Sequence, residues 1–141
     1  MQSFEDLDVW CRAFRLVKPI YRLTASYPRE ERYGLTSQTR SAVVSVSATI
    51  AEGSRRRTPG EFRNLLSNAS GSAAELECLL LIGVELGFAT PQEARPLLAE
   101  IRAISRMIRS LDTTLARRYA RPPKRTRPPH SKPEPPQPGG G

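Results

Sequence analysis

The chain has 141 residues and a formal net charge of +8, with 22 Lys and Arg against 14 Asp and Glu. Its length suits a single domain. The N-terminus is acidic and lacks a basic flank before an apolar run, so we expect no signal peptide. No apolar stretch approaches the length that spans a bilayer, which predicts a cytoplasmic protein without a membrane partner.

The positive charge is concentrated near the C-terminus. Residues 1–119 and residues 120–141 each carry a net charge of +4, although the second segment is far shorter. This segment holds 8 of the 13 prolines and has no apolar periodicity, so it cannot bury a core. We predict a folded domain over residues 1–119 and a disordered, basic, Pro-rich tail over residues 120–141. The tail either attracts phosphates or only aids solubility.

A first helix is expected from about Glu5, with Ser3 as a possible N-cap. Two heptad rows predict its buried stripe, which comprises Leu7, Phe14 and Tyr21 together with Trp10, Val17 and Thr24. Pro19 predicts a kink, because proline removes a backbone hydrogen bond. The opposite face carries the basic residues Arg12, Arg15, Lys18 and Arg22, which either contact nucleic acid or are simply solvated.

A second helix is predicted from about Leu35 to Ser54. Its many Ser, Ala and Gly residues leave little side chain between backbones, so it belongs at the crowded centre of a bundle or at a subunit interface. Gln38 and Glu52 are two heptads apart and project similarly, and Glu75 lies in a small or apolar segment farther on. We interpret these three as a buried structural polar network that sets the register of the helices.

Capping boxes mark the start of two further helices. In a capping box, the Thr hydroxyl accepts a hydrogen bond from the backbone N–H of a Glu three residues later, and the Glu carboxylate accepts one from the backbone N–H of the Thr. Thr58 and Glu61 open a helix from Pro59 to about Leu86, and Thr90 and Glu93 open the last one. Gly87 is the expected helix terminator. The apolar rows of these helices contain Phe62, Ala69, Leu76 and Gly83 in the first, and Leu97, Ile101, Ile104, Ile108, Leu111 and Leu115 in the second.

Arginines supply the candidate binding residues. Besides Arg12, Arg15 and Arg22, the candidates are Arg55, Arg56 and Arg57 before the third helix and Arg102, Arg106 and Arg109 on the fourth. Arginine favours bidentate contacts with phosphate. A solvated helix surface in an Arg-rich protein of GC-rich coding origin is the alternative.

The sequence contains no recognisable catalytic or metal-binding motif. The only histidine is His130, in the tail, and neither a phosphate loop nor zinc-ligand spacing occurs. Cys11 and Cys78 fall near apolar helical positions and are expected to be buried reduced thiols. We therefore predict no catalytic residues, no metal site, no cofactor and no enzyme activity.

Four helices with one apolar stripe each, joined by short links, predict an all-α, antiparallel up-down-up-down four-helix bundle. The segments that carry a family resemblance are Phe4-Glu5-Asp6-Leu7, Tyr33-Gly34-Leu35, Ala51-Glu52-Gly53-Ser54-Arg55 and Gly71-Ser72 with Glu75-Leu76. In order and spacing they resemble the bacterial four helix bundle protein family. This is also called the large-subunit ribosomal RNA intervening-sequence protein family, and it is related to the accessory variability proteins of diversity-generating retroelements.

The resemblance implies a homopentamer that binds nucleic acid, structured RNA in preference to DNA, through its basic surfaces, and in the retroelement relatives a reverse transcriptase partner. The function expected on this basis is that of a non-enzymatic, oligomeric accessory protein. A protein-protein adaptor that docks a reverse transcriptase or another enzyme, with its arginines merely solvated, is the alternative.

Overall fold

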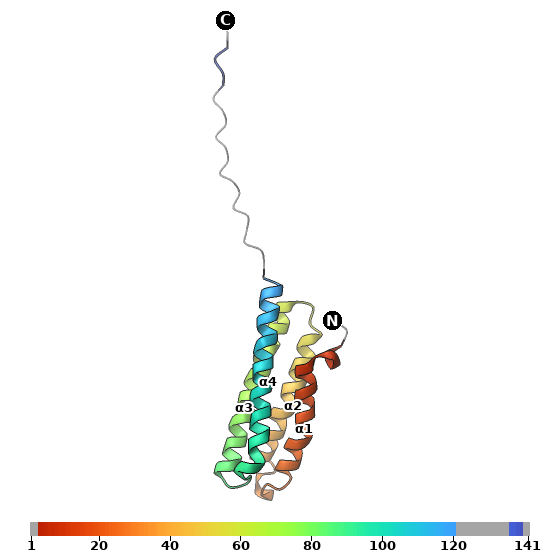
Figure 1. Cartoon of the computed structure of the whole chain (residues 1–141), viewed down its shortest axis with the longest axis vertical. Coiled ribbons are helices and arrows are strands. Elements are labelled where there is room, and N and C mark those ends of the chain that lie inside the picture. Colours follow the sequence, from red (N-terminus) through yellow and green to blue (C-terminus); the bar gives the residue numbers. More distant parts are fainter. Residues whose placement is uncertain (1–2, 121–135, 140–141) are drawn as a thin grey trace.

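The computed structural model describes residues 3–120 and 136–139. It contains four long helices, α1 (Asp8–Thr24), α2 (Leu35–Ser54), α3 (Pro59–Glu85) and α4 (Pro91–Arg118), and two short 3₁₀ helices, η1 (Phe4–Asp6) and η2 (Arg29–Glu31). The described residues contain no strand. The predicted antiparallel up-down-up-down bundle is confirmed (Figure 1).

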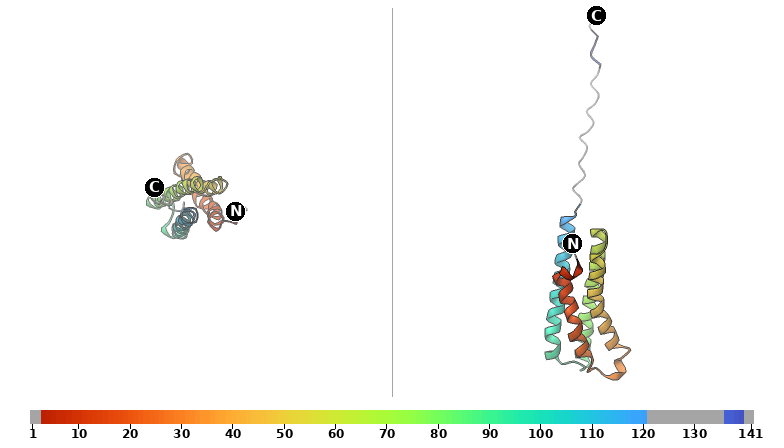
Figure 2. Two further views of the ribbon diagram at one scale, coloured as in Figure 1. Left: turned by 90° about the horizontal axis from the view of Figure 1, so that it is seen from above. Right: turned by 90° about the vertical axis from the view of Figure 1, so that its right-hand side faces the viewer.

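Each helix packs against its two neighbours in the bundle. Contacts join α1 to α2, α2 to α3, α3 to α4 and α4 back to α1. The view along the bundle axis shows the helices arranged around a common axis (Figure 2), and their buried side chains form one hydrophobic cluster. The core consists mainly of Val, Leu, Ile and Ala, and its largest fully buried side chains include Ile20, Ile50, Leu66, Leu80 and Ile104.

The helix ends follow from local sequence. Both predicted capping boxes are present: Thr58 Oγ1 accepts from the Glu61 N–H at 3.2 Å, and Thr90 Oγ1 accepts from the Glu93 N–H at 3.1 Å. Gly87 has φ of 75°, a left-handed conformation that glycine adopts without strain, and it ends α3 as predicted. These interactions are local, which is why the pattern predicted them.

The first helix differs from its prediction in where it begins. Ser3 does cap a helix, accepting the Glu5 N–H at 3.3 Å, but this is the short η1, and α1 begins only at Asp8 after an extended Leu7. Helix α1 then continues through Pro19 to Thr24 without a break.

The predicted buried stripe of α1 was right for Thr24, which is buried, but wrong for Phe14 and Tyr21. Phe14 is 56% exposed and Tyr21 is 40% exposed. The buried face consists instead of Val9, Ala13, Leu16, Ile20 and Leu23, which recur at the same three-and-four spacing but on a helix face rotated from the predicted one. Trp10 and Val17 are partly buried at its edge. The side chains that α1 contributes to the core are therefore mostly aliphatic, and its exposed Tyr21 ring lies beneath Arg40 of α2.

Helix α3, alone among the described helices, has the length and apolar composition to cross a membrane. The expectation that no segment reaches this length therefore does not hold for α3. Within the bundle, Leu66, Ala69 and Leu80 of this helix are fully buried against the other helices. The core helix of a bundle has the same length and composition, so this property is weak evidence of a membrane span.

Candidate nucleic-acid interface

The nine predicted arginines are all on the surface, but they differ in their partners. Arg12 is half-buried and the other eight are exposed. Three of them, Arg12, Arg56 and Arg102, form ion pairs with glutamates. Among residues 3–120 and 136–139, no ion pair involves the other six, Arg15, Arg22, Arg55, Arg57, Arg106 and Arg109. The structure thus divides the candidates into compensated and uncompensated charges.

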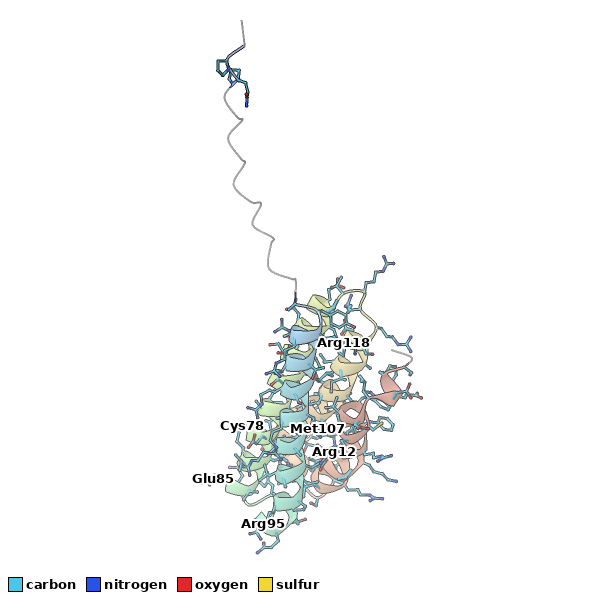
Figure 3. The ribbon with its side chains drawn as sticks, turned by 45° about the horizontal axis from the view of Figure 1, so that its top comes forward. Arg12, Cys78, Glu85, Arg95, Met107 and Arg118 are labelled. Carbon is cyan, nitrogen blue, oxygen red and sulfur yellow. The ribbon has the colours of Figure 1, made fainter. Side chains whose placement is uncertain are left out.

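Arg12 of α1 is held by Glu100 of α4. Its Nε and Nη2 donate to the two carboxylate oxygens of Glu100, each at 2.7 Å. Its Nη1 lies 3.4 Å from the sulfur of Met107, and Figure 3 labels both Arg12 and Met107. The hydrogen bond from Arg12 lowers the pKa of Glu100, and the same bond raises the pKa of Arg12. Because this bidentate pair occupies the guanidinium, Arg12 fits a structural role between α1 and α4 better than a phosphate contact.

The pair of Arg56 with Glu52 is exposed, and in the pair of Arg102 with Glu77 the arginine is exposed and the glutamate is partly buried. Their N–O distances are 2.6 Å and 2.7 Å. Exposed ion pairs contribute little stability, about 0 to 1 kcal/mol, because water competes for both charges. These two arginines can therefore exchange a carboxylate for another anion at low cost.

One end of the bundle gathers arginines from two separate segments. Arg55, Arg56 and Arg57 form the turn between α2 and α3, and Arg117 and Arg118 are in the last turn of α4. The antiparallel arrangement places the C-termini of α2 and α4 at the same end of the bundle, and we call these five residues the basic end (Figures 1 and 3).

Cations at helix C-termini are favourable because they complement the negative end of the helix dipole. Arg55 lies over the Phe4 ring, 5.2 Å from its centroid. The helices on either side of the turn carry the acids Glu52 of α2 and Glu61 of α3, and Glu61 is engaged in the capping box. The contribution of Arg117 and Arg118 to this surface was missed in the sequence, although the alternating direction of the helices was a usable signal for it.

A groove between α3 and α4 adds residues that the sequence analysis missed. It has a volume of about 390 Å³ and is lined by Arg63, Asn64, Ser67 and Ser70 of α3 and by Asp112 and the already predicted Arg109 of α4, above Leu66 and Ile108. Arg63 Nε donates to Asp112 Oδ1 at 2.9 Å. The polar residues of α3 are spaced four and three apart, a signal that could have placed them on one face.

The predicted polar network is absent. Gln38, Glu52 and Glu75 are all exposed, and no hydrogen bond joins any two of them in the described part of the chain. Glu52 is paired instead with Arg56, four residues on. Gln38 and Glu52 do lie on the same side of α2, as their heptad spacing predicted. That side faces the solvent, however, so these polar groups stay hydrated and need no buried hydrogen-bond partners.

The cysteine prediction was wrong for Cys78 and only partly right for Cys11. Cys78 is exposed on α3, whereas Cys11 is half-buried with its thiol 3.2 Å from the Glu5 carbonyl oxygen. Within residues 3–120 and 136–139, no group of three His, Cys, Asp or Glu side chains is placed to hold a metal ion. His130 and most of the predicted tail lie outside the described residues.

Residues 5–110 match the 23S rRNA-intervening sequence protein family. Among solved structures, the fold is similar to that of a protein with unknown function from the S23 ribosomal protein family of Bacteroides thetaiotaomicron, with a TM-score of 0.67 and 18% sequence identity over 74% of this chain and 97% of that one. No curated protein matches the chain. Because the family match spans most of its length, the chain belongs to the 23S rRNA-intervening sequence protein family.

Proposed function

We propose that this protein associates with RNA as a non-enzymatic accessory protein, using the basic end and the arginines of α4. The observation that carries this proposal is the gathering of Arg55, Arg56, Arg57, Arg117 and Arg118 at one end of the bundle. The name of the family, which refers to an intervening sequence in 23S rRNA, supports RNA over other polyanions.

Contacts of this kind act through phosphates. Arginines that neutralise phosphates release condensed counterions, which gives affinity without reading the base sequence. Among the described residues, two aromatic rings lie near the basic end, Phe4 and the exposed Tyr119, and each lies beneath an arginine of that end, Arg55 and Arg118. We therefore propose recognition of the backbone and shape of a structured RNA, with little sequence specificity.

The candidate arginines do not contribute equally in this proposal. Arg106 and Arg109 of α4 are exposed and continue the positive surface from the basic end along the outer side of the bundle. Arg56 and Arg102 join them after exchanging their carboxylate partners. Arg12 is left out, because Glu100 occupies its guanidinium.

Self-association is a second part of the proposal, as a homopentamer in line with the family resemblance. Phe14 of α1 is 56% exposed and stacks on the partly buried Trp10, with centroids 4.8 Å apart, and Val44 of α2 is 41% exposed. Such exposed apolar groups favour a protein contact. A ring would multiply weak RNA contacts. The same apolar groups also support the alternative of an adaptor that docks a reverse transcriptase or another enzyme.

The test is fluorescence anisotropy of a labelled RNA hairpin titrated with the full chain at several salt concentrations. Binding that weakens linearly on a logarithmic salt scale, by about 0.7 to 0.9 units per phosphate contact, supports the proposal. A DNA hairpin of the same sequence measures the preference for RNA. A chain ending at residue 119 measures how much the tail contributes to RNA affinity. Absence of RNA binding by the full chain overturns the proposal and favours the adaptor.

A further inference from the structure

The groove between α3 and α4 combines an apolar floor with polar and charged walls. Its floor is apolar, made by the fully buried Leu66 and Ile108, and its walls are polar. Two arginines, one from each helix, face the same hollow: Arg63 and Arg109. Because polar and charged side chains line this seam, it is open to a polar occupant.

The donors of this groove are largely unused within the protein. No hydrogen bond in residues 3–120 and 136–139 involves the side chains of Asn64, Ser67 or Ser70, and Arg109 has no ion-pair partner there. An amide, two hydroxyls and a guanidinium supply the N–H and O–H groups that an anion with several oxygens accepts.

The one acid of the groove already occupies part of Arg63. The Asp112 carboxylate accepts from Arg63 Nε, and both side chains are substantially exposed, at 38% and 45%. An exposed pair is weak and exchanges readily. A phosphate presents two oxygens to the guanidinium fork, so it can replace Asp112 at Arg63 and gain contact with Arg109 as well.

The groove also lies close to the basic end. Arg63 is four residues after Pro59, the first residue of α3, and Asp112 is six residues before Arg118, the last residue of α4. A strand whose backbone contacts the basic end therefore reaches the groove by continuing along the α3–α4 seam. This continuity favours a phosphodiester of a chain over a free phosphate.

We propose that the α3–α4 groove binds a backbone phosphate of RNA between Arg63 and Arg109, with Asp112 as an internal anion that competes with it. This rests on the proposed function, and it adds a defined subsite in which one acidic residue limits affinity. Asn64, Ser67 and Ser70 orient the phosphate oxygens in this arrangement. Removing Asp112 therefore strengthens RNA binding, which a purely structural ion pair would not do.

The experiment measures RNA hairpin affinity of the full chain by anisotropy for Arg109→Gln and Asp112→Asn. Two matched controls, Arg29→Gln and Glu30→Gln, make the same charge changes on η2 at the other end of the bundle. Thermal unfolding by circular dichroism establishes that each variant is folded. We expect Arg109→Gln to weaken binding about tenfold and to lower the salt slope by about 1. Asp112→Asn is expected to tighten binding several-fold, and both controls to stay near the wild type.

The outcomes separate this inference from the proposed function. Suppose that the wild type binds RNA, but the RNA affinity of Arg109→Gln equals that of Arg29→Gln, or that of Asp112→Asn equals that of Glu30→Gln. The groove is then not a subsite, and the proposed function stands. If the wild type does not bind RNA, both are overturned. Adenosine monophosphate is added as a competitor: competition as strong as that of the unlabelled hairpin would assign the groove to a mononucleotide and overturn the backbone phosphate.

Discussion

Arg12 of α1 and Glu100 of α4 are 88 residues apart in sequence and are joined by two parallel hydrogen bonds of 2.7 Å. The pair connects the first helix to the last, where the chain has no covalent link. Its side chains are 42% and 32% exposed, so water screens the attraction. The expected contribution is correspondingly modest, about 0.5 to 1 kcal/mol of unfolding free energy.

The first prediction concerns the pH dependence of this pair. The pKa of Glu100 is lowered by the hydrogen bond from Arg12, so the carboxylate form is favoured in the folded protein. The stabilisation is complete above the ordinary glutamate pKa of about 4.3 and is lost as pH falls through the lower folded pKa. The melting temperature of Glu100→Gln should lie below that of the wild type at neutral pH, and the gap should close on acidification.

Glu75→Gln is the matched control, because Glu75 is exposed on α3 and takes part in no ion pair with the described residues. Its melting temperature should follow that of the wild type at every pH. A Glu100→Gln gap that persists unchanged at pH 3 would show that the ionised pair is not its cause.

The second prediction compares two glycines of α3. A Cβ at Gly83 would overlap the Tyr27 hydroxyl, whereas a Cβ at Gly71 would meet nothing within 4 Å. Gly71→Ala should raise the free energy of unfolding by about 0.5 to 1 kcal/mol through helix propensity. Gly83→Ala should lower it by about 1 to 3 kcal/mol through overpacking. Urea denaturation of both variants measures the difference.

Tyr27 provides the internal check on this explanation. Its hydroxyl is buried without a hydrogen-bond partner among the described residues, and burial raises its pKa. Removing the hydroxyl by Tyr27→Phe should cost little by itself and should restore part of the stability lost in Gly83→Ala. If the double variant is no more stable than Gly83→Ala, the hydroxyl is not the clashing group.

The third prediction tests the basic end. Arg55 and Arg57 are exposed and in no ion pair within the described chain, so replacing both with Ala should weaken RNA binding roughly tenfold and reduce the salt slope by about 1.5. The double variant Arg29→Ala with Arg32→Ala removes the same charge at the opposite end and should have little effect. Equal losses in the two variants would indicate general electrostatic attraction instead of a defined surface.

The fourth prediction concerns the thiols. Cys78 is exposed, whereas Cys11 is half-buried beside η1. Under native conditions a maleimide should therefore modify the Cys78 thiol quickly and the Cys11 thiol slowly. Mass spectrometry of the time course, with Cys78→Ser as the control, assigns the fast reaction. A fast reaction that survives in Cys78→Ser would place Cys11 at the surface and imply that η1 opens readily.

Local features of the bundle could be derived from the sequence alone. The bounds of α2, the capping boxes at Thr58 and Thr90 and the terminator Gly87 depend on residues within four positions of each other, and each was confirmed. The row of Phe62, Ala69, Leu76 and Gly83 was also buried as predicted. Short-range interactions of this kind can be predicted from the spacing of residues in the sequence, because the backbone geometry of a helix determines them.

The tertiary structure decided which apolar face is buried and which arginines retain an uncompensated charge. Helix α1 has two apolar faces of similar periodicity, and only the presence of α2 and α4 selects the one with Ala13 and Leu16 over the one with Phe14. Likewise, the sequence places both Arg12 and Arg109 on exposed basic faces of helices, but in the structure Glu100 forms an ion pair only with Arg12. Burial and charge compensation depend on residues brought together from distant helices, and that information lies in the packing of the bundle.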